Sequence, residues 1–126
     1  MDRSPLELPV GVAVKIHIRA VEVAHPRTGA MLEISGPVDF AAWDECHFEL
    51  TDPDTGFSKV VPGLCLLVDQ VDGQAVEKRA NVVSRRLIQA LRPYLESGAY
   101  RQLAFTIKKT AERPRSTFSV ATEPLA

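Results

Sequence analysis

Long apolar runs are absent from this chain of 126 residues. No stretch approaches the roughly 18 consecutive apolar residues that a membrane-spanning helix requires, and the N-terminus does not have the charged-then-apolar pattern of a secretory signal. We therefore expect a cytoplasmic protein with no membrane partner. Hydrophobic residues still make up 45% of the chain, which at this length is enough for the core of one domain.

Cysteine is also scarce, because the chain contains only Cys46 and Cys65. Both lie in apolar, strand-like surroundings, and that setting favours buried, reduced thiols over a disulfide bond. The pair Cys46-His47 together with the distant Cys65 has neither the spacing nor the number of ligands of a zinc site. The sequence thus predicts no structural metal and no disulfide.

Motifs for catalysis or nucleotide binding are missing as well. There is no G-x-x-x-x-G-K-[ST] loop and no G-x-G-x-x-G loop, and none of the 3 histidines lies beside a nucleophile in a recognisable motif. The run Asp52-x-Asp54-x-Gly56 resembles the start of a calcium loop. Gly63, however, occupies the position of the closing glutamate, so a hairpin turn is the better interpretation. We expect no enzymatic activity, no metal and no cofactor.

One helix is predicted over residues 81–98. Its apolar side chains recur at steps of one, three and four and form a single stripe: Leu87, Ile88, Leu91 and Leu95. Ser84 is the expected N-cap, because its hydroxyl can accept a hydrogen bond from the first turn, and Gly98 is the expected residue of positive φ after the last turn. Pro93 has no amide proton, so we expect either a kink near Arg92 or a short second helix with Pro93 in its first turn.

A C-terminal hairpin is the clearest strand signal in the chain. Apolar and polar residues alternate on both sides of a turn expected at residues 112–113. That turn would place Ile107 opposite Phe118 and Phe105 opposite Val120, with these side chains on the core side. The opposite face of the hairpin would be polar.

Shorter alternating runs predict further strands. The first extends from Val12 to Ala24, and its apolar phase changes near Arg19 and Ala20, which indicates a β-bulge. Other strands are expected near residues 32–34, 46–50 and 57–68, the last one bent at Pro62-Gly63; residues 69–78 are typical of a polar connection, and residues 36–44 of an insertion.

The order of these elements is several strands, one helix and a closing hairpin. It favours a mainly β fold with one helix, in the form of a small OB-like Greek-key β-barrel. The alternative is an open α+β sheet with one packed helix. Residues 1–9 are polar and contain two prolines, so we expect a flexible N-terminus followed by a single domain over residues 10–126.

A family resemblance rests on four segments: LPVGVAVKIHIRAVEV, CHFELTDPDTG, VVSRRLIQALRPYLESG and LAFTIKKTAERPRSTFSV. Together they cover most of the chain and resemble the OB-fold single-stranded-DNA-binding accessory proteins of phages and plasmids. The resemblance is one of pattern and contains no diagnostic motif. The polar face of the hairpin departs from it, because that face lacks the aromatic residues usual for base stacking.

The net charge of −1 conceals an asymmetry along the chain. Residues 1–77 carry 5 basic and 13 acidic side chains, a balance of −8, whereas residues 78–126 carry 10 basic and 3 acidic ones, a balance of +7. Such a division indicates either an acidic face and a basic face, or a basic hairpin projecting from an acidic body. The alternative is that the two halves interleave in space and neutralise each other.

We predict that single-stranded DNA or RNA is the partner. In OB barrels a single strand lies across strands 2 and 3 and is gripped by the loops that join strands 1–2 and 4–5. Stacking on bases would have to come from Phe40, Trp43 or Phe57, and the alternative for each is core packing. The candidate nucleic-acid-binding residues are Lys15, Arg19, Arg27, Trp43, Lys108, Lys109, Arg113 and Arg115.

A protein–protein interaction module is the alternative function. The same barrel could serve as an assembly subunit, an adaptor or an inhibitor. It would bind an acidic partner through the basic hairpin, or a basic partner through Glu45, Glu49, Asp52 and Asp54.

Overall fold

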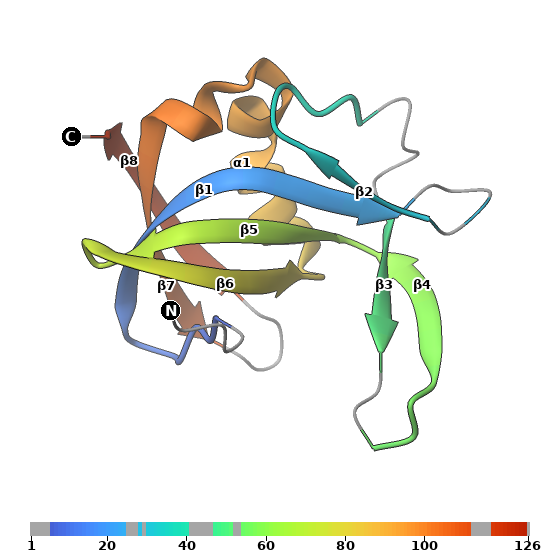
Figure 1. The fold of residues 1–126 in the computed structure, drawn as a ribbon. Helices are drawn as coiled ribbons and strands as arrows, with labels where there is room; N and C mark the ends of the chain where they lie inside the picture. The colour runs from blue at the N-terminus through green and yellow to red at the C-terminus, as the bar shows by residue number, and fades with distance from the viewer. Residues whose placement is uncertain are drawn as a thin grey trace.

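The computed structural model describes residues 6–24, 28, 30–40, 47–51, 54–111 and 117–125, with the backbone alone described for 47–51 and 58–62. This part of the chain is mainly β with a single α-helix, as the sequence predicts. The strands are β1 (Ala13–Ala24), β2 (Met31–Ile34), β3 (His47–Thr51), β4 (Ser58–Pro62), β5 (Leu64–Val71), β6 (Gln74–Val82), β7 (Leu103–Ala111) and β8 (Thr117–Pro124). The helices are α1 (Arg85–Ser97) and a short 3₁₀ helix, η1 (Ala99–Gln102) (Figure 1).

Strand β1 is the centre of the sheet, because β2, β3, β5 and β7 all pair with it. Its first half pairs with β7 and its second half with β2, while β5 lies along its other edge. Buried residues alternate up to Ile18, and then Ala20 and Val21 are both buried, so the apolar phase changes. The ladder to β5 is irregular between His17 and Ala20, which confirms the predicted bulge.

A hairpin of β5 and β6 stands where a polar connection was predicted over residues 69–78, so that prediction was wrong. Its turn is Asp72-Gly73, with φ angles of 50° and 83°, and a two-residue hairpin turn of type I′ requires positive φ at both residues. Charged and polar residues separate the buried ones of β6, and this mixture hid the strand: Val76, Ala80 and Val82 are buried. The overlooked signal was the Asp-Gly pair itself.

Helix α1 begins later than predicted, because β6 occupies the start of the predicted segment. The Leu87 N–H donates a hydrogen bond to the Ser84 hydroxyl oxygen at 3.4 Å, which confirms the N-cap, and Gly98 follows the helix with φ of 80°, as expected. Pro93 lies inside this one helix, so the alternative of a second helix starting there is wrong. The buried stripe consists of Leu87, Leu91 and Leu95.

The β7–β8 hairpin forms as predicted, but its register differs by two residues, since Ile107 lies opposite Val120 rather than Phe118. The pairing nearest the turn joins Ala111 to Thr117 and is centred on residue 114, beyond the predicted residues 112–113, and this displacement sets the register. A two-residue shift leaves every side chain on its predicted face, because side chains alternate with a period of two. Phe105 and Ile107 are accordingly buried, with exposures of 0% and 1%.

The sheet stays open in the described part of the chain, and the predicted closure into a barrel is not seen. A barrel would require β6 and β8, the edge strands that follow β5 and β7 in the sheet, to pair with each other, and they do not. N-terminal residues lie in this opening: the Leu6 N–H donates to the Arg79 carbonyl of β6 at 2.9 Å, and the Gly11 N–H donates to the Lys109 carbonyl of β7 at 2.8 Å. The open sheet with one packed helix is therefore the arrangement present.

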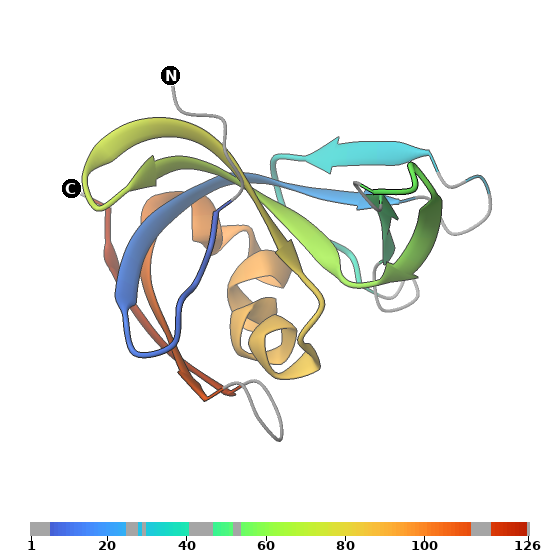
Figure 2. The same cartoon turned by 90° about the horizontal axis from the view of Figure 1, so that it is seen from below.

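Strands β3 and β4, with residues 54–57 between them, form an arm that projects from the rest of the molecule (Figures 1 and 2). Its base is tied to the sheet where Ala24 of β1 pairs with His47 of β3. A single bent strand over residues 57–68 was predicted here. The chain instead forms two strands, β4 and β5, separated at Gly63, whose φ is 141°.

The core lies between the concave face of the sheet and α1 (Figure 2). Tyr94 of the helix meets Phe105 of β7 edge-to-face, with the ring centroids 5.5 Å apart. The predicted insertion at residues 36–44 begins in this core, because Val38 and Phe40 are buried; its residues 41–44 lie outside the description. No helix among the described residues has the length and apolarity needed to cross a membrane.

Candidate nucleic-acid interface

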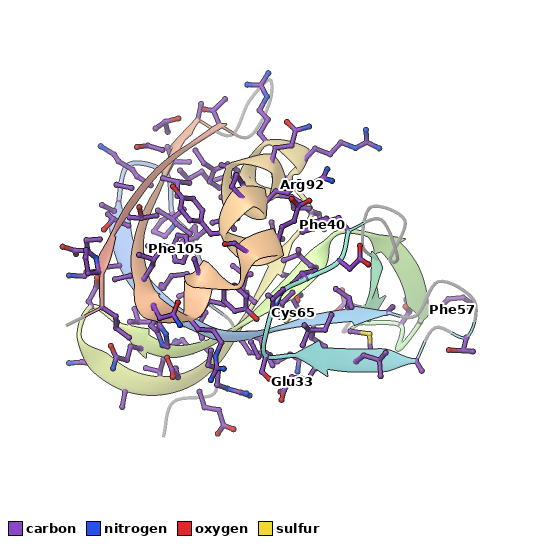
Figure 3. The ribbon with its side chains drawn as sticks, turned by 90° about the horizontal axis from the view of Figure 1, so that it is seen from above. Glu33, Phe40, Phe57, Cys65, Arg92 and Phe105 are labelled. Carbon is purple, nitrogen blue, oxygen red and sulfur yellow. The ribbon has the colours of Figure 1, made fainter. Side chains whose placement is uncertain are left out.

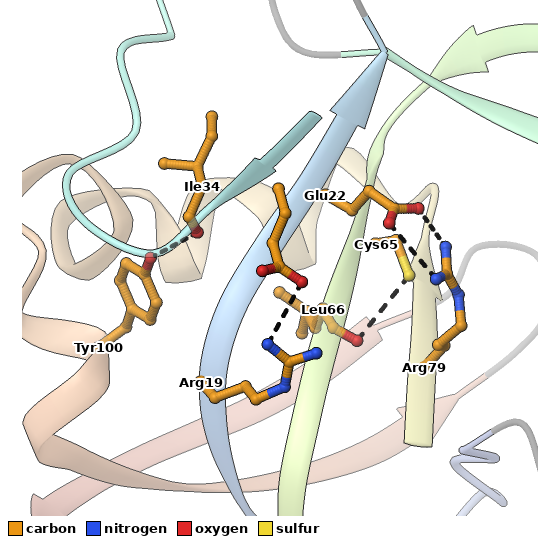
Figure 4. A network of polar contacts seen from close by, with 8 residues as sticks. Arg19, Glu22, Ile34, Cys65, Leu66, Arg79 and Tyr100 are labelled. Carbon is orange, nitrogen blue, oxygen red and sulfur yellow. Dashed lines mark hydrogen bonds and ion pairs between the residues drawn. The ribbon is translucent and has the colours of Figure 1, made fainter. Parts of the chain in front are cut away.

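Lys15 and Arg19 lie on the outer face of β1, the face of the sheet away from α1, and each is paired with a carboxylate. The Lys15 ammonium forms an ion pair with Glu123 of β8. Arg19 Nη1 lies 3.3 Å from Glu33 Oε1 of β2 (Figure 4). Such exposed pairs contribute little to stability, but they neutralise the charge that an anionic ligand would meet on this face.

A third ion pair on the outer face joins Arg79 of β6 to Glu22 of β1, next to the buried thiol of Cys65 (Figure 4). The Cys65 Sγ–H donates weakly to the Leu66 carbonyl oxygen at 3.9 Å. Burial raises the pKa of the Cys65 thiol, and the nearby Arg79 guanidinium opposes that shift. The thiol therefore stays protonated near neutral pH, where it is a poor nucleophile.

His17, the histidine of β1, is engaged at both ring nitrogens. Nδ1 lies 2.6 Å from Asp69 Oδ1, and Nε2 lies 2.6 Å from the Arg101 carbonyl oxygen. The ring links β1, β5 and η1, which is a structural role.

Lys108 and Lys109 lie at the end of β7; Lys109 points toward the first turn of α1, whereas Lys108 points to the opposite face of the sheet, as Thr106 does. Leu87 of that turn lines the same groove as Lys109. The turn also carries Arg85 and Arg86. Figure 3 shows the start of α1 and the paired ends of β7 and β8 at the same end of the molecule. We call Arg85, Arg86, Lys108 and Lys109 the cationic end.

The cationic end has no acidic side chain in its own segments. Residues 83–89, 107–111 and 117–120 contain 4 basic residues and none that is acidic. The first turn of α1 has no acidic residue, so its arginines add to the positive end of the helix dipole instead of offsetting it. Arg86 and Lys108 are exposed, and neither forms an ion pair with another described residue. These segments consequently carry a net positive charge.

An apolar groove of about 200 Å³ adjoins the cationic end. It lies in the opening between β6 and β8, where the sheet remains unclosed. Its lining is mostly apolar, with Lys109, Ser84 and Asn81 as the polar members. The apolar members include Leu6, Leu8, Val82, Val83, Leu87, Ile107 and Phe118.

The three aromatic candidates for base stacking fall in different settings. Phe40 is 5% exposed, and the Arg92 guanidinium carbon lies 4.9 Å from its ring centroid. This ring is therefore part of the core and is covered by Arg92. Phe57 is 78% exposed at the tip of the arm. Trp43 lies outside the described residues, as do the predicted contacts Arg27, Arg113 and Arg115.

Two features of this site were missed from the sequence. Arg85 and Arg86 were not among the candidate nucleic-acid-binding residues, although a first turn with two arginines and no acid was a usable signal. The groove could not be predicted from the sequence, because it exists only where strands β6 and β8 do not pair.

No protein-family model matches the chain, and neither does any curated protein or solved structure. Within the described ranges, no three side chains of histidine, cysteine, aspartate or glutamate come together as a metal site. The chemistry available at the cationic end is that of guanidinium and ammonium groups, which bind anions.

Proposed function

We propose that the protein binds single-stranded nucleic acid at the cationic end. The observation that carries this proposal is that the first turn of α1 and the end of β7 place four cations at one end of the molecule, in segments that contain no acidic residue. Guanidinium and ammonium groups donate charge-assisted hydrogen bonds to phosphate oxygens. A strand of regularly spaced phosphates is the ligand that suits several cations on one surface.

The strand order supports an OB-type assignment within this proposal. Strands β1, β5 and β6 form a meander, α1 follows, and the β7–β8 hairpin returns to the other edge of β1. This is the order of a five-stranded OB fold, with β2, β3 and β4 as an addition between its first two strands. In OB folds the loop between the last two strands grips the ligand, and the cationic end lies where that connection leaves β7.

The expected mode of binding is contact with the phosphate backbone. Phe118 is the one aromatic residue in the segments of the cationic end, and it is half-buried in the groove. Stacking on bases at this surface would therefore be limited, and affinity would depend strongly on salt and weakly on base sequence.

Fluorescence anisotropy of a labelled oligonucleotide, titrated at several salt concentrations, tests the proposal. Four phosphate contacts predict a slope of about −3 for the logarithm of the association constant against the logarithm of the salt concentration. Unchanged anisotropy at high protein concentration in low salt would contradict the proposal.

A matched pair of arginine variants assigns binding to the cationic end. Arg86→Glu and Arg101→Glu make the same change at exposed positions, but Arg101 lies in η1, at the other end of β7. We expect Arg86→Glu to weaken binding about tenfold or more at low salt, and Arg101→Glu to change it little. Equal losses would show that only the net charge of the protein matters. Thermal melts of both variants verify that each is folded.

Protein binding is the second candidate function, because the arm presents Phe57 with 78% of its surface exposed. Isolated exposed apolar residues are common, but a large aromatic ring at the tip of a projecting hairpin is well placed to enter a partner's pocket. If the Phe57→Ser variant binds the oligonucleotide as well as the wild type does, Phe57 does not contribute to nucleic-acid binding. Protein binding by the arm would then be a separate function.

A further inference from the structure

Strand β8 has one edge that is open to a further strand. β7 pairs with its other edge, and β7 and α1 are the described elements that pack against it. Natural proteins blunt such an edge with charged side chains, a short strand or a covering segment. The edge of β6 is protected in this way, because it carries three consecutive charged residues and its Arg79 carbonyl accepts the Leu6 N–H. In β8, which has eight residues, only Glu123 is charged.

Alternate residues of β8 direct their main-chain groups toward β7. The Leu125 N–H donates a hydrogen bond to the Gln102 carbonyl oxygen at 3.0 Å, so every second residue before Leu125 bonds to β7 in the same ladder. The residues between them direct their main-chain groups to the free edge: Phe118, Val120, Thr122 and Pro124. No hydrogen bond joins these groups to another residue of the described ranges.

The core side of this edge is incompletely covered. Phe105 and Ile107 of β7 are 0% and 1% exposed. Phe118 and Val120 of β8 pack against the same core but are only half-buried. Apolar surface thus borders the unpaired main-chain groups, and a strand added here would bury that surface and supply hydrogen-bond partners.

Proline determines how two copies of β8 can pair. About a two-fold axis, two antiparallel copies exchange hydrogen bonds between residues that face the free edge. Pro124 has no N–H to donate, so the register that uses every remaining N–H places the axis at Val120. Val120 then lies opposite the partner's Val120, and Phe118 lies opposite the partner's Thr122. Each opposed pair exchanges two hydrogen bonds, about six in all.

We infer that two copies of the chain pair through β8, antiparallel, and join their sheets across a two-fold axis at Val120. The occupant is a second copy because β8 is complementary to itself in this register. Its one charged residue, Glu123, lies opposite the partner's Thr117, so no like charges are opposed. The half-buried side chains of Phe118 and Val120 from both copies meet on the core side of the joined sheet.

The interface uses the same surface on both copies and leaves no β8 edge free, so association stops at the dimer. In Figure 3 the β7–β8 hairpin lies at the margin of the molecule, where a second copy can approach it. This inference does not rest on nucleic-acid binding.

Sedimentation velocity over a range of protein concentrations measures the association. The weight-average mass should rise from 13.8 kDa toward twice that value and no further. Added salt should change the association little, because the contact consists of main-chain hydrogen bonds and apolar groups.

A matched pair of variants at Thr122 tests the hydrogen bonds. Thr122 is exposed and its N–H is not part of the ladder with β7, so proline at this position leaves the hairpin paired. Thr122→Pro removes one donor from each copy and should weaken dimerisation about tenfold or more. Thr122→Val keeps the N–H and nearly the same shape, and it should dimerise as the wild type does. Thermal melts verify that both variants are folded.

Cysteine cross-linking locates the axis. In a Cys46→Ser background, Val120→Cys places two thiols across the axis, where the Cα atoms of the opposed residues should be about 5.5 Å apart, within disulfide range. Ser119→Cys is the control, because residue 119 lies diagonally from its counterpart at about 7–8 Å, beyond that range. After mild oxidation, Val120→Cys should form a covalent dimer on a non-reducing gel and Ser119→Cys should form far less.

Three outcomes would overturn the inference: a wild-type protein that is monomeric at all concentrations, a Thr122→Pro variant that associates as strongly as Thr122→Val, or equal cross-linking at positions 119 and 120. A monomeric wild type would mean that the edge of β8 pairs with an extended segment of another protein or stays unpaired.

Discussion

The outer face of β1 and the cationic end both carry basic side chains, but they differ in what surrounds those charges. Lys15 and Arg19 each have a carboxylate partner, contributed by strands distant in sequence. Arg86 and Lys108 have none among the described residues. A count of basic residues thus says little about anion binding, because the charge of a paired cation is offset by its carboxylate partner.

Charge reversal at the two regions should give the largest difference between them. Arg86→Glu with Lys108→Glu should reduce oligonucleotide affinity by a factor of thirty or more at low salt, because two phosphate contacts are replaced by repulsion. Lys15→Glu with Arg19→Glu makes the same change of net charge and should reduce affinity far less. It should instead lower the melting temperature, since it places like charges together. Anisotropy and thermal melts measure both effects, and the comparison fails if the two double variants bind alike.

Removal of the carboxylate partners of Lys15 and Arg19 should make the outer face of β1 more like the cationic end in its binding of oligonucleotides. Glu33→Gln with Glu123→Gln frees Arg19 and Lys15 without adding a positive side chain, and we expect a gain in oligonucleotide affinity of several-fold at low salt. The salt dependence should become steeper by up to one contact per freed cation. An unchanged affinity would mean that ion pairing is not the reason why the outer face does not bind the oligonucleotide.

Oligonucleotide binding at the cationic end should require an ordered first turn of α1, whereas the charges of the outer face do not depend on that turn. Ser84→Ala removes the hydroxyl that caps this helix and should lower the free energy of unfolding by about 1 kcal/mol. Fraying of the first turn would disperse Arg85 and Arg86, so oligonucleotide affinity should fall by a few-fold. Urea unfolding gives the stability and anisotropy the affinity. A Ser84→Asp variant, which restores a cap but adds a negative charge, should recover stability without recovering affinity.

The smallest effect concerns the pH dependence of stability at the outer face. The pKa of the Cys65 thiol is raised from 9.0 by burial, so the folded state favours the protonated thiol. This contribution is complete below the ordinary pKa and is lost as the pH rises above 9.0, where the unfolded thiol ionises first. In a Cys46→Ser background, the urea midpoint should fall between pH 8 and pH 9.5. Cys65→Ala should reduce that fall, although the variant is less stable at every pH.

Local features of the fold could be predicted well from the sequence. The Ser84 cap, the terminal Gly98 and the bulge in β1 each depend on a few neighbouring residues whose chemistry can be read directly. The β5–β6 hairpin was equally local and was missed because charged residues in β6 outweighed the Asp72-Gly73 turn. The register of β7 and β8 was wrong by two residues because the pairing is centred further along the chain than the composition of the turn indicated, and alternation alone does not fix the position of a turn.

The candidate site was predicted only in part. Lys108 and Lys109 were named from the basic hairpin, and they do lie at the cationic end. Their meeting with Arg85 and Arg86 could not be predicted, because it requires knowing which end of the helix faces the hairpin. The groove depends on two strands that stay apart, and no residue pattern marks a contact that is absent.

By itself, the amino-acid sequence determined the alternation of the strands, the apolar stripe and caps of the helix, and a charge balance of −8 in one part and +7 in the other. The tertiary structure alone decided which charges are neutralised. Lys15 and Glu123 are 108 residues apart in sequence and lie together because β7 pairs with β1 on one edge and with β8 on the other, so the ion pair crosses β7. Periodicity and capping act over one or two turns of chain, whereas ion pairing depends on the path of the whole backbone. That path also left the groove between β6 and β8.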